Sequence, residues 1–508
     1  MTPASSFAGR RVALFGLGGS GFATAESLRA GGADVAVWDD SSAARERAAA
    51  AGHSVVDLAA ADWSRFAALI LSPGVPLTHP EPHWTVPHAR TAGVEVIGDI
   101  ELFCRERARL APRAPFFAIT GTNGKSTTTA LLAHLLGSLG QAVEMGGNIG
   151  TPILALEPPS DDRCHVIELS TFQIDLTPSL RPNVGVLLNL TPDHLDRHGS
   201  MENYAAIKER LVARADRAVV AVDDPYCAAI ADRLAAQGRA ITRITTTGVP
   251  LSDGIAAEGT RILRHTGGRA PELLADLGGL PNLRGRHNAQ NAAAAIAALG
   301  PGLLDAVGED FATSMLRRPT GPSRSMGQEL TPGPSFKTAA LQAPQDEGRT
   351  KLSEALRSFA GLPHRMELVR QIGRTLFVND SKATNADAAE QSLKAFRDIH
   401  WIVGGVAKEG GIAPLAPLFD RLAKAYLIGQ SAKDFSAQLG SVPFQDCETL
   451  EAAVQAAARN AAQSDAIEPI VLLAPACASY DQFKNFEMRG ERFRTLVEAL
   501  PNTSESRS

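Results

Sequence analysis

The sequence lacks the features of a membrane, secreted or nucleic-acid-binding protein. It has only five cysteines in 508 residues, with no CxxC pair, which fits a reducing compartment better than a disulfide scaffold. No apolar run approaches the ~18 residues of a membrane-spanning helix, and the N-terminus has no apolar signal core. Basic tracts are also absent, and the formal charge is −5. We therefore expect a cytoplasmic protein that neither enters a membrane nor binds nucleic acid, and we expect a monomer.

Strands and helices alternate along most of the chain, as mainly parallel sheets require. The length favours about three domains. We predict an α/β fold with a Rossmann-like N-terminal domain (1–112), a central P-loop-type ATP-binding domain (113–360) and a Rossmann-like C-terminal domain (361–508). The predicted strands, besides the one that precedes the Gly-rich turn at residue 121, are Arg11–Phe15, Ala33–Trp38, Ala68–Leu71, Val94–Ile97, Cys164–Glu168, Val184–Leu190, Ala218–Val222, Leu376–Asn379, Ile399–Val403, Ala425–Ile428 and Ile470–Leu473.

Residues 318–350 interrupt this alternation. The stretch is rich in Ser, Thr, Gly and Gln, shows no periodicity, and carries prolines throughout. Such a composition buries too little apolar surface to offset the entropy of ordering the chain. We expect a disordered surface insertion, and the alternative is a docking segment.

The most informative motif is TGTNGKST at 120–127, between an apolar strand and an Ala/Leu-rich helix. Gly121 and Gly124 let backbone N–H groups approach phosphate oxygens, Lys125 supplies a cation, and Ser126 supplies a hydroxyl suited to Mg²⁺. A standard P-loop has glycine where Ile119 stands, which disfavours an ordinary kinase or motor ATPase. The motif predicts that the chain uses the γ-phosphate of ATP.

A second glycine-rich turn, GLGGSG at 16–21, follows the first predicted strand. Gly16, Gly18 and Gly21 match G-x-G-x-x-G, and Asp39 ends the next strand about twenty residues later, as in dinucleotide-binding domains. Taken alone, this pattern suggests NAD, so a dehydrogenase is one alternative for the first domain.

Polar clusters also follow several predicted strands, where parallel sheets place binding sites. Glu168 is positioned to hold Mg²⁺ beside the phosphate loop. Asn288 would cap the helix that begins at GRHNAQN. Alternatively, the amide side chains of this motif would hydrogen-bond to the edge of an adenine. The last cluster, ACASYDQFK, ends a strand and would open a helix whose free N–H groups suit a carboxylate. The clusters are ELSTFQ from 168, NLTPDHLDRHG from 189, GRHNAQN from 285, NDSKATN from 379 and ACASYDQFK from 476.

Together these motifs resemble the Mur ligases, in order and over nearly the whole chain, with the continuation SMENYAAIK from 200, with GLPHRME from 361 and with the continuation KNFEMRG from 484. Within that family the match is to the members that add D-glutamate to UDP-N-acetylmuramoyl-L-alanine, a cytoplasmic step of peptidoglycan precursor synthesis. The resemblance implies that ATP phosphorylates the alanyl carboxylate and that the D-glutamate amine then attacks the acyl phosphate. No Asp-Asn-Pro-Arg motif for diaminopimelate is present.

The resemblance also implies a role for each matching residue. Lys125, Glu168, His194 and Lys208 are the expected catalytic set, and Ser126, Glu168, His194 and a carbamylated Lys208 the expected ligands of two Mg²⁺ ions. The expected nucleotide contacts are Gly121, Thr122, Asn123, Gly124, Lys125, Ser126, Thr127, Asn291, Arg365 and Asp380. The expected substrate contacts are Gly18, Ser20, Asp39 and Ser72 for the UDP part, Asn148 and Asp193 nearby, and Lys382, Thr384, Lys408, Ser479 and Phe486 for D-glutamate.

The chain departs from the family pattern at one position, and three alternative functions remain. The family usually has an Asp or a similar polar residue after the glycine pair that precedes Lys408, whereas this chain has Gly404-Gly405-Val406. The alternatives are another Mur-type or folylpolyglutamate-type ligase, a nucleotide-gated binding module without catalysis, and the dehydrogenase. A binding module would need neither Lys208 nor both metal ligands.

Overall fold

The computed structural model describes residues 1–249, 251–300 and 350–501. The predicted insertion 318–350 therefore lies outside the described residues, except for Thr350. The chain divides into two compact units. The first unit holds residues 1–278 and the described residues from Ala289 to Ser358, and the second holds Gly279–Asn288 and the described residues from Phe359 onward.

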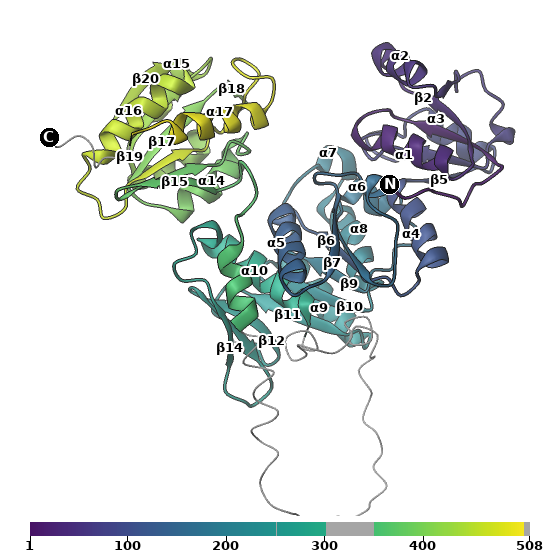
Figure 1. Cartoon of the computed structure of the whole chain (residues 1–508), viewed down its shortest axis with the longest axis horizontal. Helices are drawn as coiled ribbons and strands as arrows, with labels where there is room; N and C mark the ends of the chain where they lie inside the picture. The colour runs from purple at the N-terminus through teal and green to yellow at the C-terminus, as the bar shows by residue number, and fades with distance from the viewer. Residues whose placement is uncertain (250, 301–349, 502–508) are drawn as a thin grey trace, which may run out of the picture. The chain divides into compact units, whose positions relative to one another are not determined.

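The first unit begins with a five-stranded parallel sheet (Figure 1). Its strand order is β3-β2-β1-β4-β5. The strands are β1 (Arg11–Phe15), β2 (Asp34–Trp38), β3 (Ser54–Val55), β4 (Ala68–Leu71) and β5 (Glu95–Ile97), and the helices are α1 (Gly19–Ala30), α2 (Ser42–Ala50), α3 (Thr85–Thr91) and α4 (Asp99–Leu110). Because β1 lies between β2 and β4, the glycine-rich turn after β1 and the loop after β4 meet at one edge of the sheet.

The second sheet of this unit has nine strands in the order β14-β13-β12-β11-β10-β9-β6-β8-β7. It is parallel from β7 to β12, and β13 and β14 add antiparallel strands at one edge. The strands are β6 (Phe116–Thr120), β7 (Ala142–Gly147), β8 (Arg163–Glu168), β9 (Val184–Leu187), β10 (Arg217–Ala221), β11 (Ile241–Thr245), β12 (Gly254–Glu258), β13 (Arg261–His265) and β14 (Glu272–Asp276).

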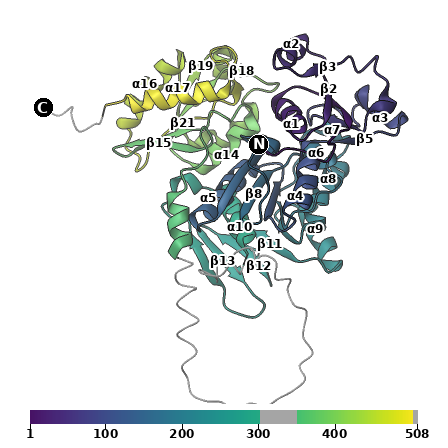
Figure 2. The same ribbon diagram turned by 45° about the vertical axis from the view of Figure 1, so that its right-hand side comes forward.

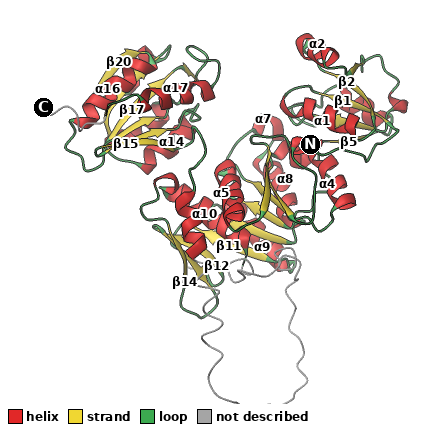
Figure 3. Ribbon diagram, viewed as in Figure 1, coloured by secondary structure: helices red, strands yellow, loops and turns green. Residues whose placement is uncertain are grey.

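Helices cover this sheet. Helix α5 packs on β6, β7 and β8, whereas α8 packs on β9 and β10, and Figure 3 shows the strands lined by these helices. The helices are α5 (Lys125–Ser138), α6 (Thr171–Asp175), α7 (Leu195–His198), α8 (Met201–Ala213), α9 (Pro225–Ala236) and α10 (Arg286–Leu299). Strand β6 is central, between β8 and β9, so the phosphate loop that follows it lies beside the ends of both neighbours.

The second unit holds a six-stranded sheet, parallel except for β15, and a two-stranded ribbon of β18 and β22. Helices α16 and α17 cover one face and α14 the other (Figure 2). The elements are β15 (Glu367–Ile372), β16 (Thr375–Asn379), α14 (Ala386–Ala395), β17 (Ile399–Gly404), β18 (Val406–Ala407), β19 (Leu422–Ile428), α15 (Ala432–Gln438), β20 (Phe444–Glu448), α16 (Leu450–Ala462), β21 (Ile470–Leu473), β22 (Cys477–Ala478) and α17 (Phe486–Glu498).

The structure confirms the α/β class and the mostly parallel sheets. All eleven strands listed from the sequence are present, and β1, β4 and β21 have the predicted bounds. Two local predictions were wrong. Helix α10 begins at Arg286, so Asn288 lies inside it and donates to the carbonyl of Arg284 rather than capping its start. The next helix after ACASYDQFK begins only at Phe486, since β22 and a turn occupy that segment.

None of the five cysteines forms a disulfide. In the described part of the chain, no helix is long and apolar enough to cross a membrane. The division into three domains at 112 and 360 stays a prediction.

Candidate active site

The phosphate loop connects β6 to α5, and its backbone requires glycine. Gly121 has φ +153° and Gly124 has φ +82°, conformations that other residues rarely adopt. A Cβ on Gly124 would lie 2.3 Å from Asn291 Oδ1, so the loop also packs too closely for a side chain. Lys125 Nζ donates to the carbonyls of Gly121 (3.0 Å) and Thr122 (2.6 Å). The loop is thus a tight turn that leads into the N-terminus of a helix, the usual geometry of an anion site.

Asn189 clamps this loop, and we did not assign it a role from the sequence. Its Oδ1 accepts from the N–H of Asn123 at 2.8 Å, and its Nδ2 donates to the carbonyl of Asn123 at 3.1 Å. Its own carbonyl accepts from the N–H of Thr122. The available signal was its place at the head of NLTPDHLDRHG, soon after the central strand β9 ends.

Glu168 is the last residue of β8 and is only 2% exposed. Its Oε1 accepts a 2.8 Å hydrogen bond from Asn148 Nδ2, which joins two of the predicted residues. Its Oε2 is buried and has no hydrogen-bond partner. A buried carboxylate oxygen without a partner is costly unless a ligand satisfies it. Since carboxylate and hydroxyl oxygens suit Mg²⁺, Glu168 and the buried Ser126 fit such an ion.

Lys208, on α8, is 2% exposed and lies under the phosphate loop. Its Nζ donates to the carbonyl of Gly121 at 2.7 Å and to Thr120 Oγ1 at 3.2 Å, and it lies 4.8 Å from the centre of the Tyr204 ring. Burial, and then the nearby charge of Lys125, hold the pKa of Lys208 well below its usual value. The lowered pKa increases the fraction of neutral, nucleophilic amine at this position.

His194 lies at the start of α7 with φ +51°. Its side chain is 54% exposed, its Nε2 is 3.6 Å from Asp193 Oδ2, and its ring packs edge-on against Phe172. No group of three or more His, Cys, Asp or Glu residues in the described ranges has the geometry of a metal cluster. The possible metal donors near the phosphate loop lie on separate elements: Glu168 on β8, Ser126 on α5 and Lys208 on α8.

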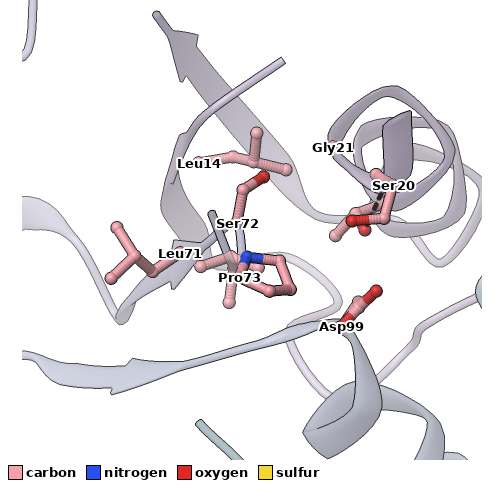
Figure 4. A pocket seen from close by; sticks show the side chains of 9 residues that line it. Leu14, Ser20, Gly21, Leu71, Ser72, Pro73 and Asp99 are labelled. Atoms are coloured by element: carbon pink, nitrogen blue, oxygen red, sulfur yellow. Dashed lines mark hydrogen bonds between the residues drawn. The ribbon is translucent and has the colours of Figure 1, made fainter. Parts of the chain in front are cut away.

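The glycine-rich turn of the first sheet forms a second site. Leu17 N–H donates to Asp39 Oδ2 at 2.6 Å, and Ser72 Oγ donates to the carbonyl of Gly16 at 2.7 Å. These bonds join the predicted residues Asp39 and Ser72 to one turn. A small pocket lies beside it, lined by Ser20, Ser72 and Pro73 from the turn and the β4 loop and by Asp99 from α4 (Figure 4). Asp99 was not predicted from the sequence.

The second unit carries the remaining candidates. Ribbon pairing of Val406 with Ala478 brings the loop of Lys408 beside the loop of Ser479. Lys382 Nζ lies 4.7 Å from the centre of the Phe486 ring. Thr384 N–H donates to the carbonyl of Lys382. Four of the five residues expected to bind D-glutamate thus lie on three loops of one unit, and the fifth, Phe486, is the first residue of α17.

Asp380 and Arg365 also belong to the second unit, whereas Asn291 belongs to the first. Asp380 is buried and accepts from Ser392 Oγ and from the N–H of Met366. Burial raises the pKa of Asp380 to about 6. In the first unit, Asn291 Oδ1 accepts from Thr128 Oγ1 at 3.2 Å, one turn into the helix that follows the phosphate loop.

Comparison with known proteins agrees with this geometry. Residues 119–299 match the Mur ligase middle domain, and residues 364–477 match the Mur ligase glutamate ligase domain. The UDP-N-acetylmuramoylalanine–D-glutamate ligase of Nitrobacter hamburgensis is 54% identical, with 99% of both chains covered, and that of Mesorhizobium japonicum is 53% identical, with 98% of both covered.

Solved structures give the same fold at low identity. The UDP-N-acetylmuramate–alanine ligase MurC of Thermotoga maritima is 18% identical with a TM-score of 0.52, over 96% of this chain and 99% of that one. The MurF ligase of the same organism, in complex with ADP, is 15% identical with a TM-score of 0.51, over 98% and 97% of the two chains. The full-length relatives establish the assignment: the chain belongs to the Mur ligase family.

Proposed function

We propose that this chain is an ATP-dependent ligase that joins D-glutamate to the carboxyl group of UDP-N-acetylmuramoyl-L-alanine. The observation that carries the proposal is the phosphate loop with Glu168 and Lys208 buried beside it, in a chain that matches D-glutamate ligases over its full length. A dehydrogenase needs none of these groups, and a binding module needs no buried lysine under the loop.

The chemistry converts a poor acyl donor, the alanyl carboxylate, into a good one. A carboxylate oxygen of the alanyl group attacks the γ-phosphorus of ATP, and ADP leaves. The amine of D-glutamate then attacks the carbonyl carbon of the acyl phosphate, loses a proton, and expels phosphate. Such transfers depend mainly on positioning and on neutralising the charge of the phosphate oxygens.

The loop residues supply part of that neutralisation. The backbone N–H groups from Gly121 to Thr127 and the ammonium of Lys125 would bind the phosphates. Glu168 and Ser126 would hold a first Mg²⁺, and His194 a second, and when bound these ions would shield the charge on the phosphate oxygens. The unpartnered Oε2 of Glu168 supports the first of these sites.

Lys208 would serve as a carbamate. The neutral amine adds to CO₂, forming an N–C bond and releasing one proton, and the resulting carbamate has an anionic oxygen suited to Mg²⁺. Its burial and lowered pKa support this role, because only the neutral amine reacts.

The other candidates would bind the UDP substrate and D-glutamate and complete the binding of ATP. Gly18, Ser20, Asp39 and Ser72 would hold the UDP part, with Asn148 and Asp193 nearer the reacting carboxylate. Lys382, Thr384, Lys408, Ser479 and Phe486 would hold D-glutamate, and Asn291, Arg365 and Asp380 would contact the adenine and ribose-phosphate parts of ATP. The N-terminal, central and C-terminal domains would thus bind the UDP substrate, ATP and the amino acid.

Phosphate release tests the proposal. The protein is mixed with ATP, Mg²⁺, UDP-N-acetylmuramoyl-L-alanine and one amino acid at a time. D-Glutamate should support release, whereas L-glutamate and diaminopimelate should not. Release with either of the latter two, and not with D-glutamate, would indicate another Mur-type or folylpolyglutamate-type ligase.

A further inference from the structure

Arg489, on the first turn of α17, is a buried cation that none of the proposed roles uses. Its side chain is 1% exposed. Its Nε donates to Ser381 Oγ at 3.0 Å, and its Nη2 donates to the carbonyls of Ser381 (2.9 Å) and Cys477 (3.0 Å). Its Nη1 is buried without a hydrogen-bond partner. A buried charge is costly unless an opposite charge compensates it.

No carboxylate forms an ion pair with this guanidinium in the described part of the chain. Asp481 is near enough to act on its charge, but Asp481 Oδ2 accepts from the N–H of Gln430 at 3.0 Å. Desolvation lowers the pKa of Arg489 to about 10, so the side chain still carries its proton at neutral pH. The fold therefore keeps a positive charge inside the second unit that no carboxylate of the described residues neutralises by direct contact.

The partners of Arg489 lie on the loops that carry the expected D-glutamate contacts. Ser381 precedes Lys382, and Ser381 Oγ donates to the carbonyl of Phe486 at 2.8 Å. Cys477 belongs to the ribbon strand that leads to the buried Ser479. One guanidinium thus connects the loop of Lys382, the loop of Ser479 and the start of α17.

The third loop also approaches this cation. Gly405 has φ +129°, and a Cβ placed on it would lie 3.4 Å from Arg489 Nη1. Gly405 begins the loop that ends in Lys408, and its carbonyl accepts from Ser431 Oγ at 2.6 Å. The unpartnered Nη1 therefore lies where all three loops come together.

We propose that Arg489 is a positioning residue for the amino-acid substrate, whose buried charge favours a dicarboxylic amino acid over its neutral amide. This inference rests on the proposed function, since it takes D-glutamate as the amino acid. The guanidinium fixes the loops of Lys382 and Ser479 through hydrogen bonds to Ser381 and Cys477, and it lies close to the third loop at Gly405. The second carboxylate of the substrate supplies a negative charge that balances the positive charge of Arg489, which forms no ion pair within the described residues. Arginine suits this task because its planar fork stays charged when buried.

The test compares Arg489→Met, which removes the charge at similar volume, with Arg489→Lys, which keeps the charge but loses the fork. The readouts are KM for each of the three substrates and the ratio of kcat/KM for D-glutamate to that for D-glutamine. In Arg489→Met we expect the D-glutamate KM to rise about tenfold or more and the ratio to fall by a similar factor. The KM values for ATP and the UDP substrate should stay within about twofold.

Arg489→Lys separates the effect of the charge from that of the hydrogen-bonding geometry. It also tests the proposal if Arg489→Met does not fold. We expect its D-glutamate KM to rise about threefold or more while the D-glutamate to D-glutamine ratio stays within about twofold of wild type. The matched control is Arg370→Met. Arg370 binds the carbonyls of Val497, Glu498 and Leu500 at the other end of α17, so its loss should lower stability but change neither readout.

Equal rises in all three KM values, or an unchanged D-glutamate to D-glutamine ratio in Arg489→Met, would show that Arg489 is only structural and overturn the proposal. A fallen ratio in Arg489→Lys would likewise contradict the role of charge. Wild-type enzyme that makes no product from D-glutamate would overturn the proposed function, and this inference with it. Normal turnover of D-glutamate by Arg489→Met would overturn this inference alone.

Discussion

Lys208 Nζ donates a 2.7 Å hydrogen bond to the carbonyl oxygen of Gly121. The buried lysine therefore contacts the turn that would hold the phosphates of ATP. Lysine side chains are almost never fully buried in folded proteins unless they are paired, so the burial of Lys208 suggests a function. Its position directly under the phosphate loop gives the first prediction.

Replacing Lys208 with alanine should lower kcat by about a hundredfold or more, because the anionic oxygen that it would supply is lost. Acetate or another small carboxylate should restore part of the activity by occupying the vacated space. Steady-state phosphate release measures both effects. Lys394→Ala, which removes an exposed lysine paired with Glu390, is the control. Full activity of Lys208→Ala without acetate would rule out a carbamate.

Glu168→Gln keeps the shape of the side chain and its contact with Asn148 but removes the charge. We expect the Mg²⁺ concentration for half-maximal activity to rise about tenfold or more, since one charged ligand is lost. A magnesium titration of the initial rate measures it. Glu157→Gln, at an exposed position of the same unit, should leave the titration unchanged. An unaltered Mg²⁺ requirement in Glu168→Gln would remove Glu168 from the metal site.

Gly124→Ala and Gly137→Ala form a matched pair. The first places a Cβ 2.3 Å from Asn291 Oδ1 at a positive φ, whereas the second meets no atom within 4 Å. We expect Gly124→Ala to weaken ATP binding about tenfold or more by displacing the loop. Gly137→Ala, inside α5, should keep ATP binding and gain up to about 1 kcal/mol of stability. Calorimetric titration with ATP compares them, and equal affinities would contradict the loop geometry.

Asp99 should make stability depend on pH. Burial raises its pKa from the ordinary 3.8 to about 6, so the folded state binds a proton more tightly than the unfolded state. The stability that Asp99 contributes is complete below about pH 4, falls as pH rises to about 6, and stays low above that, a change of up to about 3 kcal/mol. Asp99→Asn cannot ionise, so its melting temperature relative to wild type should rise between pH 4 and pH 7. A constant difference would show that Asp99 is not desolvated.

The sequence predicted most of the central strands and missed several edge strands, although it found β5. Buried parallel strands such as β6 and β8 are continuous apolar runs that end in polar motifs, so Glu168 was found together with its strand. Strands β12, β13 and β14 were not predicted, because they are short and half polar, pair antiparallel with one another, and lack the strand–helix alternation of the rest of the chain.

Buried charged residues to which no motif gives a role were harder to identify from the sequence than residues whose role a motif implies. Lys125 and Lys208 came from ordered motifs. Arg489 and Asp99 look like solvent-exposed residues of amphipathic helices when read in sequence, since nothing local shows that the loops of other elements cover them. Their burial depends on contacts between segments up to about a hundred residues apart, such as that of Arg489 with Ser381.

The most direct test of the central claim is the product formed from an equimolar mixture of D-glutamate, L-glutamate and diaminopimelate with ATP, Mg²⁺ and UDP-N-acetylmuramoyl-L-alanine. Mass spectrometry of the UDP product, with chiral analysis of the added residue, identifies the amino acid that was joined. The account predicts one D-glutamate per product and one phosphate released for each bond. Addition of L-glutamate or diaminopimelate, or product formed without phosphate release, would contradict it.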